Sequence, residues 1–500
     1  MAKINFSNIQ GNILKGFDKD NVRLIFFNVG SVDNASRWFR QVVEQKRIPS
    51  TTDLIEAEAR INEIRKYYSV VDRRETWMHV SFSANGLRKF KLDLPPSHNA
   101  YTFKNLNPKQ KADPEIYLKN GSVVVDESDP FNAGMKNRSK ILGDTQKDDP
   151  KNWIEPFNHL SGRIDGVIRI DSDYPADADK ASIDLINEFT EGGLACVGLQ
   201  KGTVIFNRHG KHIEHFGFRD GVSQPLFKGI DDDKIAKRKI EKDVHDPRKF
   251  VLFGLKTERS WANDGSFMVF RRLSQDFEMF WEFMGKNSHH YDLTPIGLAA
   301  RFVGRWKSGA PLAKFPKGDP DLPRAFDDND FGYLDNENHR RLNDPRGEKT
   351  PRFAHIRKVY PRDDGMSEDA EENDKQADTH RIIRRGIPFG PLFADNPEAE
   401  RGLLFICYQV DLERQFEFIQ QSFANSPNFP RQDEHAAEGP GIDPIIGKYR
   451  DNGFVNLLQN GRFRKITGLK QWVTTTGGEY FFSPSLSALK NLKTRKKRIT

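Results

Sequence analysis

One acidic residue stands where a carboxylate could do chemistry. Asp220 lies in GFRDGVSQP, residues 217–225, between Gly217 and Gly221. Aspartate and glycine are typical of surface turns, because glycine accepts a positive φ angle and aspartate bonds back to the backbone. The alternative is a carboxylate that takes and returns a proton during a reaction, since aspartate is one of the side chains used as a general acid or base. The stretch alone leaves both interpretations open.

Two adjacent arginines form a second candidate group. Arg384 and Arg385 follow two isoleucines and precede the turn-forming sequence GIPFG. A guanidinium held between an apolar strand and a rigid turn is a fixed positive charge beside apolar space, and such charges stabilise developing anions. The alternative is a pair of arginines on the surface.

Histidine supplies the third kind of side chain. HGKHIEH (209–215) has the irregular spacing of a weak metal-binding pattern, whereas His355 in PRFAHIRKVYPR and His380 in HRIIRRGIPFGP have richer settings. Haem peroxide chemistry needs an axial imidazole for iron, an acid or base for the peroxide proton, and a cation for the departing oxygen. The sequence holds all three, together with 38 phenylalanines for an apolar pocket.

Blocks of sequence that run in order along the chain resemble the dye-decolorizing peroxidases. GFRDG matches the Gly-x-x-Asp-Gly signature of that family, and the surrounding HFGFRDGVSQP resembles it closely. The other matching blocks are IQGNILKGF (9–17), HVSFSANGL (79–87), DGSFMVFRRLSQD (264–276), VGRWKSGAPL (303–312), AHIRK (354–358), RIIRRGIPFG (381–390) and RGLLFICYQ (401–409). Because the blocks cover almost the whole length in order, chance is a poor explanation.

The resemblance implies roles for three residues. His355 in the AHIRK block would be the proximal ligand of haem b, with one haem per chain. Asp220 would be the distal acid and base, and Arg384 would stabilise negative charge as the O–O bond breaks. The implied activity is the reduction of hydrogen peroxide to water through a ferryl intermediate, with oxidation of dyes, phenols or other organic reductants.

The resemblance places three more residues near the haem. Leu403 and Phe405 match positions that line the distal side in relatives. Asp411 is expected to accept a hydrogen bond from the imidazole of His355 and so raise its basicity.

The chain departs from the family at two positions, and these bear on how electrons enter. Relatives carry tryptophan near FIQQSFANSPNF, where this chain has Phe423, and some bacterial relatives carry asparagine where this chain has Gly386. A narrow distal pocket should admit peroxide but exclude a bulky dye. Large reductants are therefore expected to give electrons from outside, through side chains such as Tyr408 or Tyr360.

The elements that must position these residues alternate between strand and helix. Apolar patterns that change from the strand period to the helix period begin near residues 22, 76, 166, 264 and 402. They predict an α+β fold, and the resemblance implies two ferredoxin-like domains, each an antiparallel sheet with peripheral helices, with the haem in a pocket mainly of the C-terminal half. We expect an N-terminal domain carrying GFRDG (1–235), a haem-binding domain (236–486) and a basic tail (487–500).

Composition narrows the class of protein and its location. The 500 residues are enough for two or three domains and a pocket for a sizeable cofactor. There is no run of eighteen apolar residues and no apolar N-terminal segment of the signal-peptide type, so we expect a soluble cytoplasmic protein without a membrane partner. The two cysteines, Cys196 and Cys407, are far apart, which excludes a disulfide framework.

Two other functions are compatible with the sequence. A haem-binding or haem-processing protein with incidental peroxidase activity would use the same pocket. A nucleic-acid-associated protein would use the basic tail, but six lysines and arginines in the last fifteen residues account for all but +1 of the net charge of +7. No nucleic acid partner is therefore expected, whereas the resemblance suggests a homo-oligomer.

Overall fold

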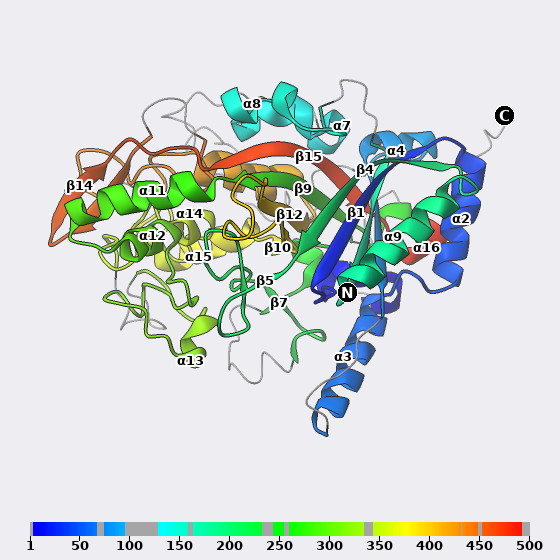
Figure 1. Ribbon diagram of the computed structural model, residues 1–500, viewed down its shortest axis with the longest axis horizontal. Coiled ribbons are helices and arrows are strands. Elements are labelled where there is room, and N and C mark those ends of the chain that lie inside the picture. Colours follow the sequence, from blue (N-terminus) through cyan, green and yellow to red (C-terminus); the bar gives the residue numbers. More distant parts are fainter. Residues whose placement is uncertain are drawn as a thin grey trace.

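The computed structural model describes the chain in nine stretches: residues 4–67, 75–95, 129–158, 164–232, 244–254, 260–334, 344–431, 433–448 and 453–492. Figure 1 shows two α+β units beside each other, with the first half of the chain in blue to teal and the second half in green to red. The predicted boundary at residues 235 and 236 lies outside the described residues, as do residues 493–500 of the tail.

The N-terminal unit follows the order strand, helix, strand, strand, helix, strand. Its elements are β1 (Asn21–Val29), α2 (Val32–Glu44), β2 (Trp77–Phe82), β3 (Gly166–Ser172), α9 (Pro175–Phe189) and β4 (Leu194–Thr203). The strands pair antiparallel in the order β2-β3-β1-β4. This order and topology are those of a ferredoxin-like domain.

Local sequence explains the elements of this unit. The central strand β1 reads NVRLIFFNV and is buried along almost its whole length, because neighbouring layers cover both of its faces. Helix α2 begins after Ser31, whose side chain accepts a hydrogen bond from the backbone of Asn34. Helix α9 begins at Pro175, where the missing N–H costs nothing.

The C-terminal unit repeats the same order with shorter or irregular elements. They are β9 (Ser266–Gln275), α11 (Phe277–Asn287), β10 (Ile383–Arg384), β11 (Ile387–Phe389), β12 (Gly402–Gln409), the π-helices η9 (Leu412–Glu417) and η10 (Ile419–Ala424), and β15 (Val473–Ser483). The strands pair antiparallel in the order β10-β12-β9-β15, and β11 also pairs with β12.

Strand β15 joins the two units. It pairs with β9 along its length, and Phe482 near its end pairs with Phe82 of β2; in Figure 1 it is the long red strand that crosses between the halves. One apolar core fills the space between them, where the rings of Phe26 on β1 and Phe270 on β9 lie 5.3 Å apart.

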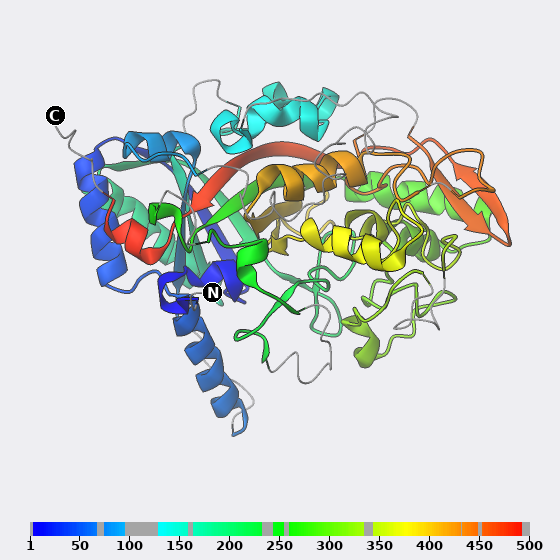
Figure 2. The same cartoon turned by 180° about the vertical axis from the view of Figure 1, so that it is seen from behind.

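The long segment between β9 and β10 carries the remaining helices near the site. They are α12 (Pro295–Val303), α13 (Pro323–Phe326), α14 (His355–Val359) and α15 (Ala370–Thr379), and Figure 2 shows α15 in yellow beside the strands of the second unit. In the first unit, α3 (Thr51–Arg65) extends away from the body of the molecule. None of the helices in the described part of the chain has both the length and the apolar character needed to cross a membrane.

The predicted strand-to-helix patterns are confirmed at β1 and α2, β2 and α4 (Ala84–Lys89), β3 and α9, and β9 and α11. The pattern near residue 402 is confirmed as a strand, but the helix after it winds as two π-helical segments.

Candidate functional site

A cavity in the C-terminal unit collects five of the six residues expected at the site. It has a volume of about 250 Å³, and its wall includes Asp220, His355, Arg384, Leu403 and Phe405. The sixth, Asp411, is not part of the wall. Most of the rest of the lining is apolar, including Val222, Leu273, Val303, Val359, Phe416, Ile419 and Ile446.

Asp220 and Arg384 form an ion pair at this cavity. Arg384 Nη1 donates to Asp220 Oδ1 over 2.9 Å, and the backbone N–H of Gly221 donates to the same oxygen over 2.6 Å. Gly221 has a φ angle of 76°, which glycine adopts without strain and which turns its N–H onto the carboxylate. Both of these hydrogen bonds use Oδ1, so Oδ2 is left for another partner.

Gln224 fixes the backbone of Arg384. Its side-chain oxygen accepts from the Arg384 N–H and its Nε2 donates to the Arg384 carbonyl, both over 3.1 Å. Strand β10 holds the same residue by pairing Arg384 with Cys407 of β12. Sequence reasoning missed Gln224, although it lies only four residues after Asp220 in the matching block.

The environment of Asp220 favours its ionised form. Burial alone would raise the pKa of this carboxyl, but the Arg384 charge, the hydrogen bonds from Gly221 and Arg384, and the more distant His355 together hold the pKa below its ordinary value of 3.8. A carboxylate at this position is therefore ready to accept a proton across the neutral and mildly acidic range.

His355 is the first residue of α14 and faces the cavity with its side chain one quarter exposed. Its Nδ1 lies 2.8 Å from Oδ2 of Asp443, which is fully buried. The other oxygen of Asp443 accepts from the N–H groups of Ile445 and Ile446, over 2.8 and 3.1 Å. A carboxylate that accepts from Nδ1–H leaves Nε2 of the ring for a metal.

The expected contact between Asp411 and His355 is therefore corrected, because Asp443 holds that position. Asp411 instead caps η9, where its side chain accepts from the backbone N–H of Arg414 over 2.9 Å. Aspartate is a strongly preferred cap residue, which accounts for its place after β12. The signal for Asp443 was GPGIDPIIG, where an acid stands in a glycine- and proline-rich turn as Asp220 does.

The other histidine pattern does not form a metal site. The described residues contain no group of three or more His, Cys, Asp or Glu side chains that could hold a metal ion. In HGKHIEH, His209 pairs with Asp321 and His215 with the carbonyl of Phe389. His380 does line the cavity, but its ring stacks on Phe418 with the centroids 3.9 Å apart.

The cavity wall fits a haem. One imidazole nitrogen is available for iron, and apolar side chains suit a porphyrin face. Arg271 on β9 is 2 % exposed, and its Nε and Nη1 are buried without a hydrogen-bond partner among the described residues. Buried donors are costly when unsatisfied, and a carboxylate such as a haem propionate would satisfy them.

The fold and the site together define an α+β protein in which an acid–arginine pair and a histidine backed by a buried acid face one cavity. Residues 8–112 match the family described as "DyP dimeric alpha+beta barrel domain", and residues 214–434 match "Dyp-type peroxidase, C-terminal". The chain belongs to the dye-decolorizing peroxidase family, and it is a haem-dependent peroxidase.

Individual relatives agree with this assignment. The chain is 35 % identical over 407 residues to a dye-decolorizing peroxidase of Mycena epipterygia, covering 72 % of this chain and 70 % of the relative. It is 32 % identical over 396 residues to the multifunctional dye peroxidase DyP2 of an Amycolatopsis species, covering 74 % and 79 %. The crystal structure of a fungal DyP-type peroxidase from Auricularia auricula-judae superposes with a TM-score of 0.74 at 26 % identity, covering 98 % of this chain and 99 % of that one.

Proposed function

We propose that Asp220 and Arg384 activate hydrogen peroxide in the cavity, where His355 holds the iron of one haem b per chain. The proposal rests on one observation: an acid–arginine pair and a histidine backed by an acid face the same cavity. Asp220 and Arg384 face it from a loop and from β10, and His355, backed by Asp443, faces it from α14.

The two distal residues would divide the chemistry between them. Asp220 accepts a proton from peroxide on its carboxylate and returns it to the leaving oxygen, so that water departs. Arg384 stabilises the negative charge that develops on that oxygen. Its bonds to Asp220 and to the carbonyl of Ser223, at 2.9 and 3.2 Å, hold the guanidinium in place before peroxide arrives.

The haem would be held by residues of the C-terminal unit and supplies the redox chemistry when bound. His355 would ligate iron through Nε2, while the contact of its Nδ1 with Asp443 keeps the ring oriented. The two open donors of Arg271 would pair with a propionate, and Leu403 and Phe405 would exclude water and bulky molecules from the distal space.

Organic reductants such as dyes or phenols would complete the cycle from outside the cavity. Once a haem occupies the cavity, the space beside Asp220, Arg384, Leu403 and Phe405 would be left to peroxide. Of the two tyrosines expected to pass electrons, Tyr360 is half-buried and lines the cavity. Tyr408 is fully buried and hydrogen-bonded to Asn12, so Tyr360 is the better candidate.

The test is an absorption spectrum of the purified holoprotein before and after one equivalent of peroxide. We expect one haem b per chain by pyridine haemochrome assay, and a rapid change of the Soret band when peroxide is added. A spectrum that stays unchanged over seconds would overturn the proposal.

A haem-processing role is less well supported, because relatives matched over most of the chain are named as dye peroxidases. We also propose that the protein is a homo-oligomer, which size-exclusion chromatography tests. A cytoplasmic location is a further proposal, which cell fractionation tests.

A further inference from the structure

The loop that carries Asp220 begins with a turn closed by Glu214. The backbone N–H of Glu214 donates to the carbonyl of Phe218 over 3.0 Å, and the N–H of Gly217 donates to the carbonyl of Glu214 over 2.9 Å. The side chain of Glu214 folds back into the same turn. Its two oxygens accept from the N–H groups of Phe216 and Phe218, over 2.9 and 2.8 Å.

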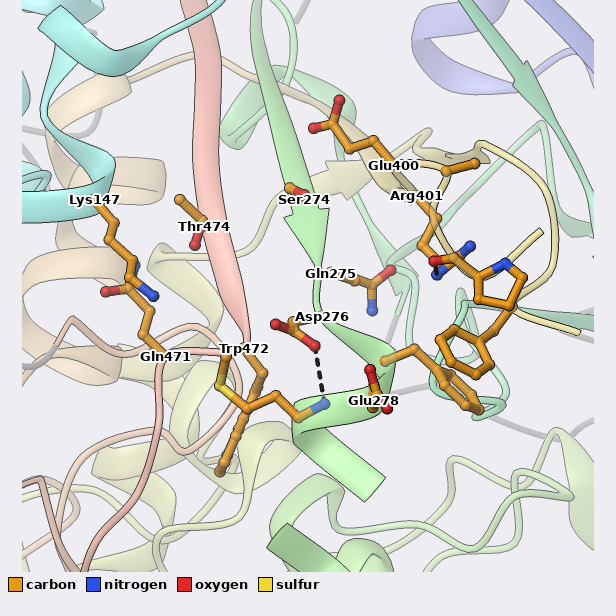
Figure 3. Close-up of a pocket in the computed structure, with 15 residues that line it drawn as sticks. Lys147, Ser274, Gln275, Asp276, Glu278, Glu400, Arg401, Gln471, Trp472 and Thr474 are labelled. Carbon is orange, nitrogen blue, oxygen red and sulfur yellow. Dashed lines mark hydrogen bonds between the residues drawn. The ribbon is translucent and has the colours of Figure 1, made fainter. Parts of the chain in front are cut away.

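Gln275 ties this carboxylate to the sheet of the C-terminal unit. It is the last residue of β9, and its Nε2 donates to Glu214 over 2.6 Å. The backbone of Gln275 is fixed in turn, because its N–H donates to the carbonyl of Arg401 over 2.8 Å. Gln275 lines both the haem cavity and a separate pocket of about 290 Å³, where Figure 3 shows it between Asp276 and Arg401.

Aromatic packing holds the outside of the turn. Phe216 and Phe218 are each 2 % exposed. The ring of Phe216 stacks on Phe280 of α11 with centroids 4.2 Å apart, and Phe218 lies parallel to Trp281 at 6.3 Å. The turn is therefore fixed from the inside by one carboxylate and from the outside by two rings, and Asp220 follows it by two residues.

We propose that Glu214 is a positioning residue for Asp220, which it sets against the cavity through the turn it closes and through Gln275. The inference rests on the proposed role of Asp220 in activating peroxide. Three N–H donors converge on this side chain, and only an acid offers two accepting oxygens at that place. In Glu214→Gln, an NH₂ group replaces one of the two accepting oxygens, so its N–H groups face N–H donors of the turn. A shift of about 1 Å in a reacting group can cost about 10²-fold in rate, so a loosened turn should be visible in the peroxide reaction.

The chain offers a matched control in Glu479 on β15. Its carboxylate also accepts from two backbone N–H groups, those of Met135 and Tyr480, over 3.0 and 2.8 Å. Burial raises its pKa, as burial raises the pKa of Glu214 to about 7. Glu479 is not part of the cavity wall. Glu214→Gln and Glu479→Gln therefore make the same chemical change, and only the first is expected to affect peroxide.

The experiment measures the second-order rate constant of the haem-loaded protein with peroxide by stopped-flow, at a pH above 7 where Glu214 is ionised. Glu214→Gln should lower it by about 10²-fold with the resting Soret band unchanged, and Glu479→Gln should leave it near the wild-type value. The decisive readout is a double-mutant cycle with Asp220→Asn, because residues that act through one another are not additive. Once Asp220 is replaced, Glu214→Gln should have little further effect.

Two outcomes would overturn the inference while leaving the role of Asp220 intact. One is a rate for Glu214→Gln that equals that of Glu479→Gln; the other is the same loss in both backgrounds, which marks a structural effect. A wild-type rate for Asp220→Asn alone would instead remove the proposed function, and the inference with it.

If Glu214→Gln does not fold, Gln275→Leu leaves the acid in place and removes its link to β9. This variant should show a smaller loss that also vanishes with Asp220→Asn, and an unchanged rate would overturn the inference.

Discussion

At the scale of single residues, Asp220 and Arg384 form one ion pair, but substituting each of them should remove a different contribution to the peroxide reaction. Asp220→Asn keeps the size of the side chain and removes the proton acceptor, so the peroxide rate constant should fall by about 10²–10⁴-fold. Arg384→Leu removes the charge that stabilises the departing oxygen, and the expected loss is about 10²–10³-fold. Both variants should keep their haem. Stopped-flow rates like those of the wild type in both would return Asp220 to the role of a turn residue.

The same pair predicts how the peroxide reaction depends on pH. Burial would raise the pKa of Asp220, but the Arg384 charge and the hydrogen bonds outweigh burial and hold the pKa below 3.8. The proton-accepting form therefore predominates above pH 3.8 and is lost as the pH falls through the lowered pKa. In Arg384→Leu, burial still raises the pKa of Asp220 but the guanidinium no longer lowers it. The fall of the peroxide rate constant at low pH should therefore begin at a higher pH. A fall that begins at the same pH in both proteins would contradict this assignment.

His355 and Asp443 should control haem binding. His355→Ala should lose or badly weaken haem, whereas Asp443→Asn should weaken it by about 10–100-fold, as is typical when the partner of a metal-ligating histidine is changed. Asp411→Asn is the control, because Asp411 caps η9 and Asp443 is the acid at His355. Haem titration of apoprotein gives the affinities. Full occupancy with an unchanged Soret band in His355→Ala would shift the ligand to another histidine, with His380 the first to test.

At the scale of elements, a buried ion pair connects η9 to η3 (Met135–Arg138), a short helix of the first half of the chain. Arg138 and Glu417 are each 1 % exposed, with a 2.9 Å bond from Nε to Oε1, and the hydroxyl of Tyr480 on β15 donates to the same acid over 2.8 Å. Glu417→Gln should remove the counter-charge that Glu417 supplies to Arg138 and destabilise the fold by about 3–5 kcal/mol.

Chemical denaturation measures that loss, and the exposed pair of Glu371 and Lys375 on α15 supplies the control. Glu371→Gln should leave the unfolding midpoint unchanged, because exposed pairs contribute little. A midpoint for Glu417→Gln equal to that of the wild type would show that Arg138 finds another partner at no cost.

Helices and strands were predictable from the sequence where a local pattern, such as a change of apolar period, determined the type of element. The change of apolar period marked β9 and α11, and Ser31 and Pro175 mark helix starts that follow general capping rules. The π-helical winding of η9 and η10 has no comparable signal, since apolar spacing alone does not separate it from an α-helix. The partner of His355 was missed for another reason. Asp443 lies 88 residues along the chain, and only the folded path of the chain brings it to the imidazole.

At the scale of the whole molecule, resemblance gave the two ferredoxin-like domains, but the sequence did not show how they join. Strand β15 closes the second sheet and reaches β2 of the first through Phe482 and Phe82. A pairing of strands so far apart in the chain leaves no local trace, whereas its consequence is large. Because the sheets share a core, a loop that follows the first unit can present Asp220 to a cavity built mainly by the second.

If haem fills the cavity, large reductants must give their electrons at its wall, and Tyr360 is the residue we expect to pass them. Tyr360 lines the cavity while only half-buried, and the guanidiniums of Arg381 and Arg362 lie 4.0 and 4.9 Å from its ring and hold it in place. Tyr360→Phe keeps this packing but removes the phenol that can give up an electron and a proton. Steady-state oxidation of a bulky dye should fall sharply, while the peroxide rate constant and the oxidation of a small phenol stay near wild type. Tyr408→Phe is the control, since Tyr408 is fully buried in the core. Equal dye turnover in both variants would exclude Tyr360 as the point of electron entry, and a dye bound within the cavity itself would show that large reductants reach the haem directly.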